Sequence, residues 1–170
     1  MGSHHHRRDT IERVGCVVVT ASDTRTGVDD RSGPVIRRIL EAAGHAIVDA
    51  VIVPDDAAAI RNAVMTATVR SEVGAVFVTG GTGVAARDVT IESLAGTWSK
   101  ELPGFGEIFR ALSFAEIGPA AFLSRATAGV IGNTFVAVLP GSPAACELAL
   151  GRILVPELSH VVGLLGAKTP

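Results

Sequence analysis

Apolar positions along the chain fall into short continuous runs separated by helically spaced patterns. Continuous runs rich in β-branched residues are typical of strands that are covered on both faces of a sheet. The runs are Val14–Thr20, Ala46–Val53, Ala75–Val78 and Thr134–Leu139, with a shorter one at Ala120–Leu123. The helical patterns are Pro34–Ala43, Asp55 or Asp56 to about Glu72, Asp88–Ala95, Glu101–Leu112 and a final stretch interrupted or kinked at Pro156. This alternation predicts a single α/β domain with a mostly parallel central sheet and helices on both faces.

Four loops follow strands or precede helices of this pattern. Ligands of open α/β sheets bind beyond the carboxyl ends of the strands, so we expect these loops to meet at one edge. The loops are "TASDTRTG" at Thr20–Gly27, "PDD" at Pro54–Asp56, "TGGTG" at Thr79–Gly83 and "PGSP" at Pro140–Pro143. All four are rich in small, hydroxylated or acidic residues, which predicts a polar binding site.

The glycine-rich stretch "TGGTGVAARDVTIE" at 79–92 leaves three interpretations open. Glycines allow a tight turn with exposed N–H groups, which suits a phosphate, but the same stretch also suits a turn that binds nothing. A P-loop is excluded because Val84, not Lys, follows Gly83. Gly81–Ala86 fits a dinucleotide fingerprint, with Glu101 20 residues beyond Gly81, although no strand pattern surrounds Glu101. An NAD(P)-binding oxidoreductase is therefore a remote alternative.

Two aspartates carry the chemistry that this edge offers. Asp88 and Asp55 each precede a predicted helix, so each is placed to act as an N-cap. From the residues alone the cap role is favoured, and the alternative is a Mg²⁺ site, since proteins bind this ion through one or two carboxylates together with substrate phosphates. Ser142 lies outside any G-x-S-x-G nucleophile elbow, which favours a turn or hydrogen-bonding role for it.

Composition narrows the class of protein. The chain has 170 residues, of which Met1–His6 are an expression-tag remnant, with 48% hydrophobic and 19% charged residues and a net charge of −2. That charge predicts no nucleic-acid partner, and no apolar run approaches the ~20 residues of a membrane span. Cys16 and Cys146 have no metal-ligand spacing and indicate a reducing compartment. We expect a soluble cytoplasmic domain.

Taken together, the motifs resemble the MoaB/Mog family of molybdenum cofactor biosynthesis proteins, which includes the G domains of gephyrin and plant Cnx proteins. The matching stretches are "TGGTGVAARDVTIE" at 79–92, "LPGFGEIFR" at 102–110, "LSRATAG" at 123–129 and "LPGSPAACELAL" at 139–150, with weaker agreement at "TASDTRTG" and "VPDD". The resemblance covers a domain over residues 10–166. Many family members have Pro where this chain has Ile91, which loosens the first helical turn without removing a chemical group.

The resemblance implies a three-layer α/β/α fold, a homotrimer and binding of molybdopterin. Mog-type members use Mg-ATP to adenylylate the terminal phosphate of molybdopterin, ready for metal insertion by a separate protein. By resemblance Asp88 and Asp55 are catalytic, and Asp88 also holds Mg²⁺. The implied ligand-binding residues are Ser22, Asp23, Gly80, Gly81, Thr82, Gly83, Ser124, Arg125, Gly141 and Ser142. The alternative within the family is a MoaB-type trimeric pterin-binding or scaffold protein without adenylyltransferase activity.

Overall fold

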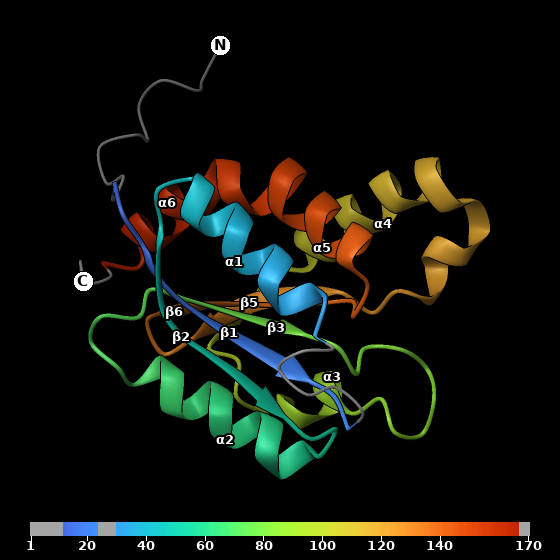
Figure 1. The fold of residues 1–170 in the computed structure, drawn as a ribbon, viewed down its shortest axis with the longest axis horizontal. Coiled ribbons are helices and arrows are strands. Elements are labelled where there is room, and N and C mark those ends of the chain that lie inside the picture. The colour runs from blue at the N-terminus through green and yellow to red at the C-terminus, as the bar shows by residue number, and fades with distance from the viewer. Residues whose placement is uncertain (1–11, 24–29, 167–170) are drawn as a thin grey trace.

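A mixed six-stranded sheet forms the centre of the computed structural model, which describes residues 12–23 and 30–166 (Figure 1). Its strands, in the described residues, are β1 (Gly15–Ala21), β2 (Ala46–Val53), β3 (Ala75–Thr79), β4 (Lys100–Glu101), β5 (Thr127–Ile131) and β6 (Thr134–Leu139). The spatial order is β2-β1-β3-β6-β5-β4. Neighbours from β2 to β6 run parallel, whereas β5 and β4 are each antiparallel to their neighbours. The predicted mostly parallel sheet is confirmed.

Helices cover both faces of the sheet, as predicted. They are α1 (Ser32–Ala42), α2 (Ala57–Thr68), α3 (Thr90–Ser93), α4 (Pro103–Ile117), α5 (Pro143–Ala149) and α6 (Val155–Leu164), with a 3₁₀ segment η2 (Gly118–Leu123) and a π-helical segment η3 (Leu150–Leu154). In Figure 1, α1, α4, α5 and α6 lie on one side of the sheet and α2 and α3 on the other. The fold is therefore three-layered.

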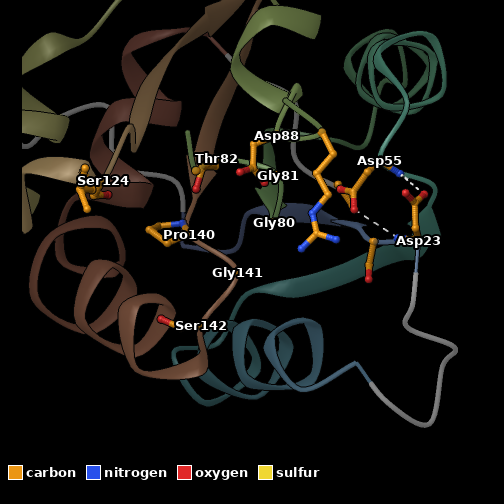
Figure 2. Close-up of a pocket in the computed structure, with 15 residues that line it drawn as sticks. Asp23, Asp55, Gly80, Gly81, Thr82, Asp88, Ser124, Pro140, Gly141 and Ser142 are labelled. Carbon is orange, nitrogen blue, oxygen red and sulfur yellow. Dashed lines mark hydrogen bonds between the residues drawn. The ribbon is translucent and has the colours of Figure 1, made fainter. Parts of the chain in front are cut away.

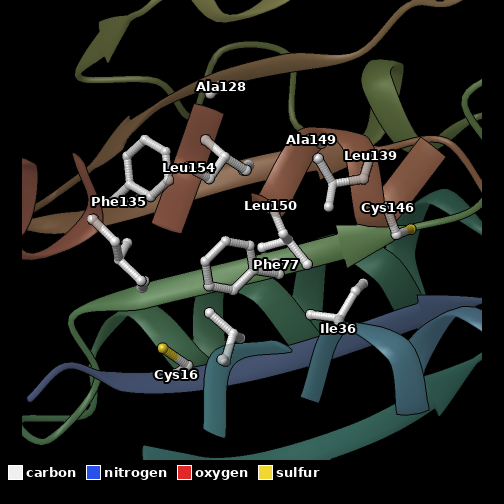
Figure 3. Close-up of a cluster of buried hydrophobic side chains, with 14 of the residues drawn as sticks. Cys16, Ile36, Phe77, Ala128, Phe135, Leu139, Cys146, Ala149, Leu150 and Leu154 are labelled. Carbon is white, nitrogen blue, oxygen red and sulfur yellow. The ribbon is translucent and has the colours of Figure 1, made fainter. Parts of the chain in front are cut away.

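Successive strand residues divide between two cores because side chains alternate across a strand. On the side of α1, Phe77 packs with Leu150 and Ile36 (Figure 3). On the opposite side, Val76 and Val78 join the core formed with α2. The central strands β1, β3 and β6 are buried along their whole length, which explains why they read as continuous apolar runs.

Two elements differ from the sequence prediction at the antiparallel side. Ala120–Leu123 is part of the 3₁₀ segment η2 and not a strand, because Pro119 follows Gly118 at its start and the run lacks β-branched residues. The strand is instead β5, which pairs with β6 through the two-residue connection Gly132–Asn133. The sequence "TAGVI" of β5 contains a small residue and a glycine, which weakened its strand pattern.

Two further boundaries were predicted imperfectly. The helix expected over Asp88–Ala95 is the single turn α3, and the helix expected to reach Glu72 ends at Thr68. The final helical stretch is interrupted as predicted, by η3, which ends two residues before Pro156; the missing N–H of this proline breaks the regular hydrogen-bond ladder. Met1–His6 lie outside the described residues. Within the described ranges, none of the helices combines the length and the apolar character that a membrane span needs.

Candidate functional site

A cleft of about 510 Å³ opens at the edge of the sheet where the parallel strands end (Figure 2). Segments that follow β1, β2, β3 and β6 all contribute to it, together with the end of η2. Its lining residues are Ala21, Ser22, Asp23, Asp55, Gly80, Gly81, Thr82, Gly83, Arg87, Asp88, Leu123, Ser124, Pro140, Gly141 and Ser142. The structure thus brings together every site residue expected from the sequence except Arg125. The remainder of the first loop, Thr24–Gly27, lies outside the described residues.

The turn after β3 depends on two glycines. Gly80 and Gly81 have φ angles of 98° and 59°, in the region that side-chain-bearing residues rarely adopt. A Cβ at Gly81 would also collide with the hydroxyl of Thr90. That hydroxyl donates a hydrogen bond of 2.8 Å to the Gly80 carbonyl and ties the turn to α3. The backbone therefore approaches the cleft closely with no side chain in the way.

Asp55 faces this glycine turn. Its Oδ2 accepts from the Asp23 N–H at 3.2 Å, and its own N–H donates to Asp23 Oδ1 at 2.9 Å, so the loops after β1 and β2 are joined (Figure 2). The other oxygen, Oδ1, is buried and has no hydrogen-bond partner among the residues that the structure describes. Buried acceptors are normally satisfied, so an unpaired carboxylate oxygen at a cleft wall is a candidate contact for a ligand or cation.

Asp55 is not a helix cap. The N-cap of α2 is Asp56, whose Oδ1 accepts from the Ala59 N–H at 2.8 Å. Since Asp56 satisfies the helix end, Asp55 is left to face the cleft. The sequence left the two adjacent aspartates as alternatives, and the structure separates them.

Asp88 does not cap a helix either, which corrects the expectation from its position. The residue before α3 is Val89, and it makes no side-chain cap. Asp88 Oδ2 instead accepts from the Ala85 N–H at 2.9 Å, and the Asp88 N–H donates to the Ala85 carbonyl at 2.9 Å. The half-buried Asp88 therefore closes a four-residue turn and presents its carboxyl group to the cleft.

The loop after β6 is held from two sides. The Ser32 hydroxyl at the start of α1 donates to the Gly141 carbonyl at 2.9 Å, and the Thr79 hydroxyl donates to the Pro140 carbonyl at 2.9 Å. Ser142 is the N-cap of α5, where its hydroxyl accepts from the Ala145 N–H at 3.3 Å. The helix N-terminus consequently points its positive end toward the cleft.

Ser124 and Arg125 reach this edge from the antiparallel part of the sheet. Because β5 runs opposite to β6, its beginning lies beside the carboxyl ends of the parallel strands. Ser124 lines the cleft, but Arg125 does not. Arg125 lines a neighbouring hollow of about 390 Å³ together with residues of the loop 83–89 and Glu92. Its guanidinium donates hydrogen bonds to the Thr82 and Asp88 carbonyls. The ligand-binding role expected for Arg125 stays a prediction.

Sequence reasoning did not single out several residues that shape the cleft. Leu123 lines it, while Ser32 and Thr90 hold its loops through hydrogen bonds. The Gly141 carbonyl that Ser32 contacts is 109 positions away in the chain, so no local sequence pattern predicts the contact. The "RDVTIE" motif contains Thr90, but nothing in its spacing identifies the Gly80 carbonyl as its acceptor.

The donor set fits a magnesium ion that is shared with a phosphorylated substrate. Across the described ranges, no group of three or more His, Cys, Asp or Glu side chains is placed to hold a metal. Asp55 and Asp88 line the same cleft, and Asp55 Oδ1 has no hydrogen-bond partner within residues 12–23 and 30–166. Mg²⁺ characteristically uses one or two carboxylates and completes its shell with water and phosphate oxygens.

The dinucleotide fingerprint does not fit this geometry. Such a motif opens a helix and has its acidic residue at the end of the neighbouring parallel strand. Here the first helix after Gly81–Ala86 is α3, which begins at Thr90. Glu101 lies in the edge strand β4, which is separated from β3 by β6 and β5. We therefore set aside the nicotinamide-binding interpretation.

Comparison with known proteins identifies the family. Residues 16–160 match the family described as "Probable molybdopterin binding domain". The chain is 48% identical to molybdenum cofactor biosynthesis protein B of Bacillus subtilis (strain 168) over 163 residues, which cover 95% of this chain and 96% of the relative. The chain belongs to the MoaB/Mog family of molybdenum cofactor biosynthesis proteins.

Solved structures of MoaB/Mog proteins share the whole architecture. A crystal structure of molybdenum cofactor biosynthesis protein B is 43% identical, with a TM-score of 0.88 over 91% of this chain and 96% of that one. The tungsten cofactor synthesizing protein MoaB from Pyrococcus furiosus is 38% identical, with a TM-score of 0.81 over 94% of this chain and 99% of that one. The family and fold expected from the motifs are confirmed.

Proposed function

We propose that the chain is a molybdopterin adenylyltransferase in molybdenum cofactor biosynthesis. It would transfer AMP from Mg-ATP to the terminal phosphate of molybdopterin and release adenylyl-molybdopterin and pyrophosphate. The observation that carries this proposal is the cleft itself, where a side-chain-free glycine turn faces two carboxylates. Histidine is absent from its described lining residues, so the cleft suits phosphate chemistry better than acyl transfer by a Ser–His pair.

The reaction requires positioning and charge neutralisation more than covalent participation by the protein. An oxygen of the pterin phosphate attacks the α-phosphorus of ATP and forms the new P–O bond. The bond from the α-phosphorus to the bridging oxygen breaks, and its electron pair leaves with pyrophosphate. A cleft that holds both phosphates in line supplies much of the catalytic effect.

Each part of the cleft has a role in this proposal. The turn Gly80–Gly83 and the N-terminus of α5 at Ser142 offer N–H groups and positive dipole to phosphate oxygens. Ser22, Asp23, Ser124 and Gly141 contact the substrates from the surrounding walls. Arg87, an exposed cation at the cleft, offsets phosphate charge.

Asp88 and Asp55 would hold Mg²⁺ in this site. The bound ion would neutralise the charge that develops on the leaving pyrophosphate. The Asp88 carboxyl group is fixed by the Ala85 N–H, and the Asp55 carboxyl group accepts from the Asp23 N–H. Both carboxyl groups are therefore oriented before substrates arrive, which lowers the reorganisation needed during reaction.

The direct test uses purified protein, molybdopterin and Mg-ATP, with adenylyl-molybdopterin measured by mass spectrometry. We expect product with the wild-type chain and at least about a hundredfold less with Asp88→Asn, while pterin binding stays nearly unchanged. Undiminished turnover in Asp88→Asn would remove this residue from the mechanism.

A second candidate within the family is a pterin-binding or scaffold protein without transferase activity. It is favoured by the kinship with proteins named molybdenum cofactor biosynthesis protein B. Tight pterin binding by the wild-type chain with no adenylylated product would select this candidate. In either case we propose that the bound pterin, adenylylated or not, passes to a separate metal-insertion protein.

We also propose that the chain works as a homotrimer. Large exposed apolar side chains gather on α4 and η2 and support a contact between copies. These residues are Ile108, Phe114, Ile117, Phe122 and Leu123. Such side chains are costly to leave in water when they are grouped.

A further inference from the structure

The loop 82–88 forms one wall of the cleft without belonging to a helix or strand. It contributes Thr82, Gly83, Arg87 and Asp88 to the lining, while Val84 is 72% exposed. Within the loop, the only hydrogen bonds between its described residues join Ala85 and Asp88. A loop with so few internal contacts needs an external support to hold a carboxylate in a fixed place.

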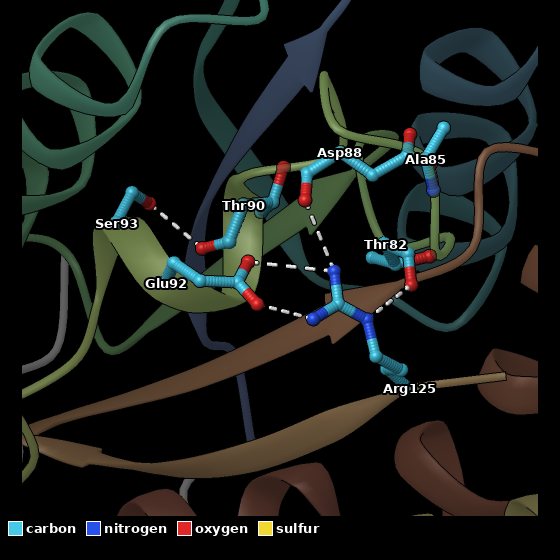
Figure 4. A network of polar contacts seen from close by, with 7 residues as sticks. All are labelled: Thr82, Ala85, Asp88, Thr90, Glu92, Ser93 and Arg125. Carbon is cyan, nitrogen blue, oxygen red and sulfur yellow. Dashed lines mark hydrogen bonds and ion pairs between the residues drawn. The ribbon is translucent and has the colours of Figure 1, made fainter.

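Arg125 contacts both ends of this loop (Figure 4). Its Nε donates to the Thr82 carbonyl at 3.1 Å, and its Nη2 donates to the Asp88 carbonyl at 3.1 Å. The guanidinium is a rigid planar fork of donors, so it fixes the spacing between these two carbonyls. Lysine, with one compact ammonium group, cannot reproduce that geometry.

Glu92 orients the guanidinium from α3. Both carboxylate oxygens of Glu92 contact Arg125, through Nη1 and Nη2. The hydrogen bond from Arg125 lowers the pKa of Glu92 below its usual 4.5, so the pair is ionised at neutral pH. The helix is itself tied to the glycine turn, because the Thr90 hydroxyl donates to the Gly80 carbonyl. Two sequence motifs 33 positions apart are thus joined into one support.

These contacts leave Arg125 poorly placed to recognise a substrate. Its nitrogens already donate to two carbonyls and a carboxylate, and its charge is balanced by Glu92. It is also absent from the described lining of the cleft. We propose that Arg125 and Glu92 are positioning residues, a clamp that holds the loop 82–88 so that Asp88 faces the cleft in its working orientation. The effect on catalysis rests on the proposed function, whereas the effect on the loop does not.

The proposal is tested with Arg125→Lys and Glu92→Gln, which preserve side-chain size, and with Arg61→Lys as a control. Arg61 also binds the α3 region, through hydrogen bonds to the Ser93 and Ala95 carbonyls, but in the described structure it makes no hydrogen bond to the loop 82–88. Amide hydrogen exchange at Ala85 and Asp88 is measured first because it requires no activity. We expect exchange about tenfold faster or more in both clamp variants and unchanged exchange in the control.

Kinetics provide the second readout. We expect kcat for adenylyl transfer to fall about tenfold to a hundredfold in Arg125→Lys, with the dissociation constants for molybdopterin and ATP changed less than about threefold. The kcat of the double variant should be no lower than that of the less active single variant, since the two residues act as one unit.

The outcomes separate this proposal from the proposed function. Unchanged loop exchange, or tenfold weaker substrate binding at unchanged kcat, would overturn the positioning role and make Arg125 a binding residue. Strictly additive losses in the double variant would also overturn the clamp. If the wild-type chain has no transferase activity, the exchange measurement still decides whether the clamp exists.

Discussion

At the scale of single residues, the adjacent carboxylates Asp55 and Asp56 do different work. The Asp56 side chain caps the first turn of α2 by accepting a hydrogen bond from the Ala59 N–H. Asp55 has a buried oxygen beside the glycine turn that makes no hydrogen bond to the described part of the chain. The difference arises from backbone direction: the N-cap position aims one side chain at the helix, and its neighbour points to the cleft.

This contrast gives a matched prediction. Asp55→Asn should lower adenylyl transfer by about a hundredfold because the cleft loses a negative charge. Asp56→Asn makes the same chemical change one position away and should leave turnover unaltered. Its free energy of unfolding should change by less than about 0.5 kcal/mol, since Asn and Asp are equivalent N-caps. Steady-state kinetics and urea unfolding measure both, and equal activity losses in the two variants would contradict the assignment.

At the scale of elements, His45 joins the beginning of β2 to the chain just before β1. The Val14 N–H donates to His45 Nδ1 at 3.3 Å, so that nitrogen must be unprotonated. The imidazole is buried, and burial lowers its pKa below the usual 6.5. The unfolded chain therefore takes up a proton on this side chain at a higher pH than the folded chain does.

The sign of the resulting pH dependence follows from linkage. The contribution of His45 to stability is complete above pH 6.5 and is lost as the pH falls from there through the lower folded pKa. We expect the free energy of unfolding, measured in urea, to fall between pH 7.5 and pH 5 by more in the wild-type chain than in His45→Gln. Glutamine can accept the same hydrogen bond without titrating. Identical pH dependence in both would show that His45 is not responsible.

At the scale of the whole molecule, the sheet is enclosed by helices while one surface stays apolar. Phe114 and Phe122 are 59% and 76% exposed on α4 and η2, which lie at one end of the molecule (Figure 1). Light scattering should give three times the chain mass of 17.4 kDa. Phe114→Ser with Phe122→Ser should reduce that mass, whereas Val69→Ser, equally exposed beside α2, should not. A monomeric wild-type chain would contradict the trimer.

Elements and side-chain roles could be predicted from the sequence where they depend on neighbouring residues, and not where they depend on distant ones. The boundaries of β6 were predicted correctly because all of its residues are buried and form a continuous apolar run. The boundaries of β2 were also predicted correctly, although this edge strand is only partly buried, because most of its residues are apolar or β-branched and Pro54 follows them. β5 was missed since its pairing with β6 compensates for a weak local pattern. Asp88 looked like a helix cap by position, but the chain closes a turn there before α3 starts.

By itself, the sequence determined the α/β pattern, the loops that meet at the strand ends and the motifs shared with the MoaB/Mog family. Glycine, proline and apolar spacing act over a few residues, so these features can be read locally. Only the tertiary structure decided that Asp55 rather than Asp56 faces the cleft, and that Arg125 contacts the loop 82–88 without lining the cleft. Those outcomes depend on hydrogen bonds between residues that are 32 to 43 positions apart in the chain. Such bonds form only after the sheet has brought distant loops to one edge.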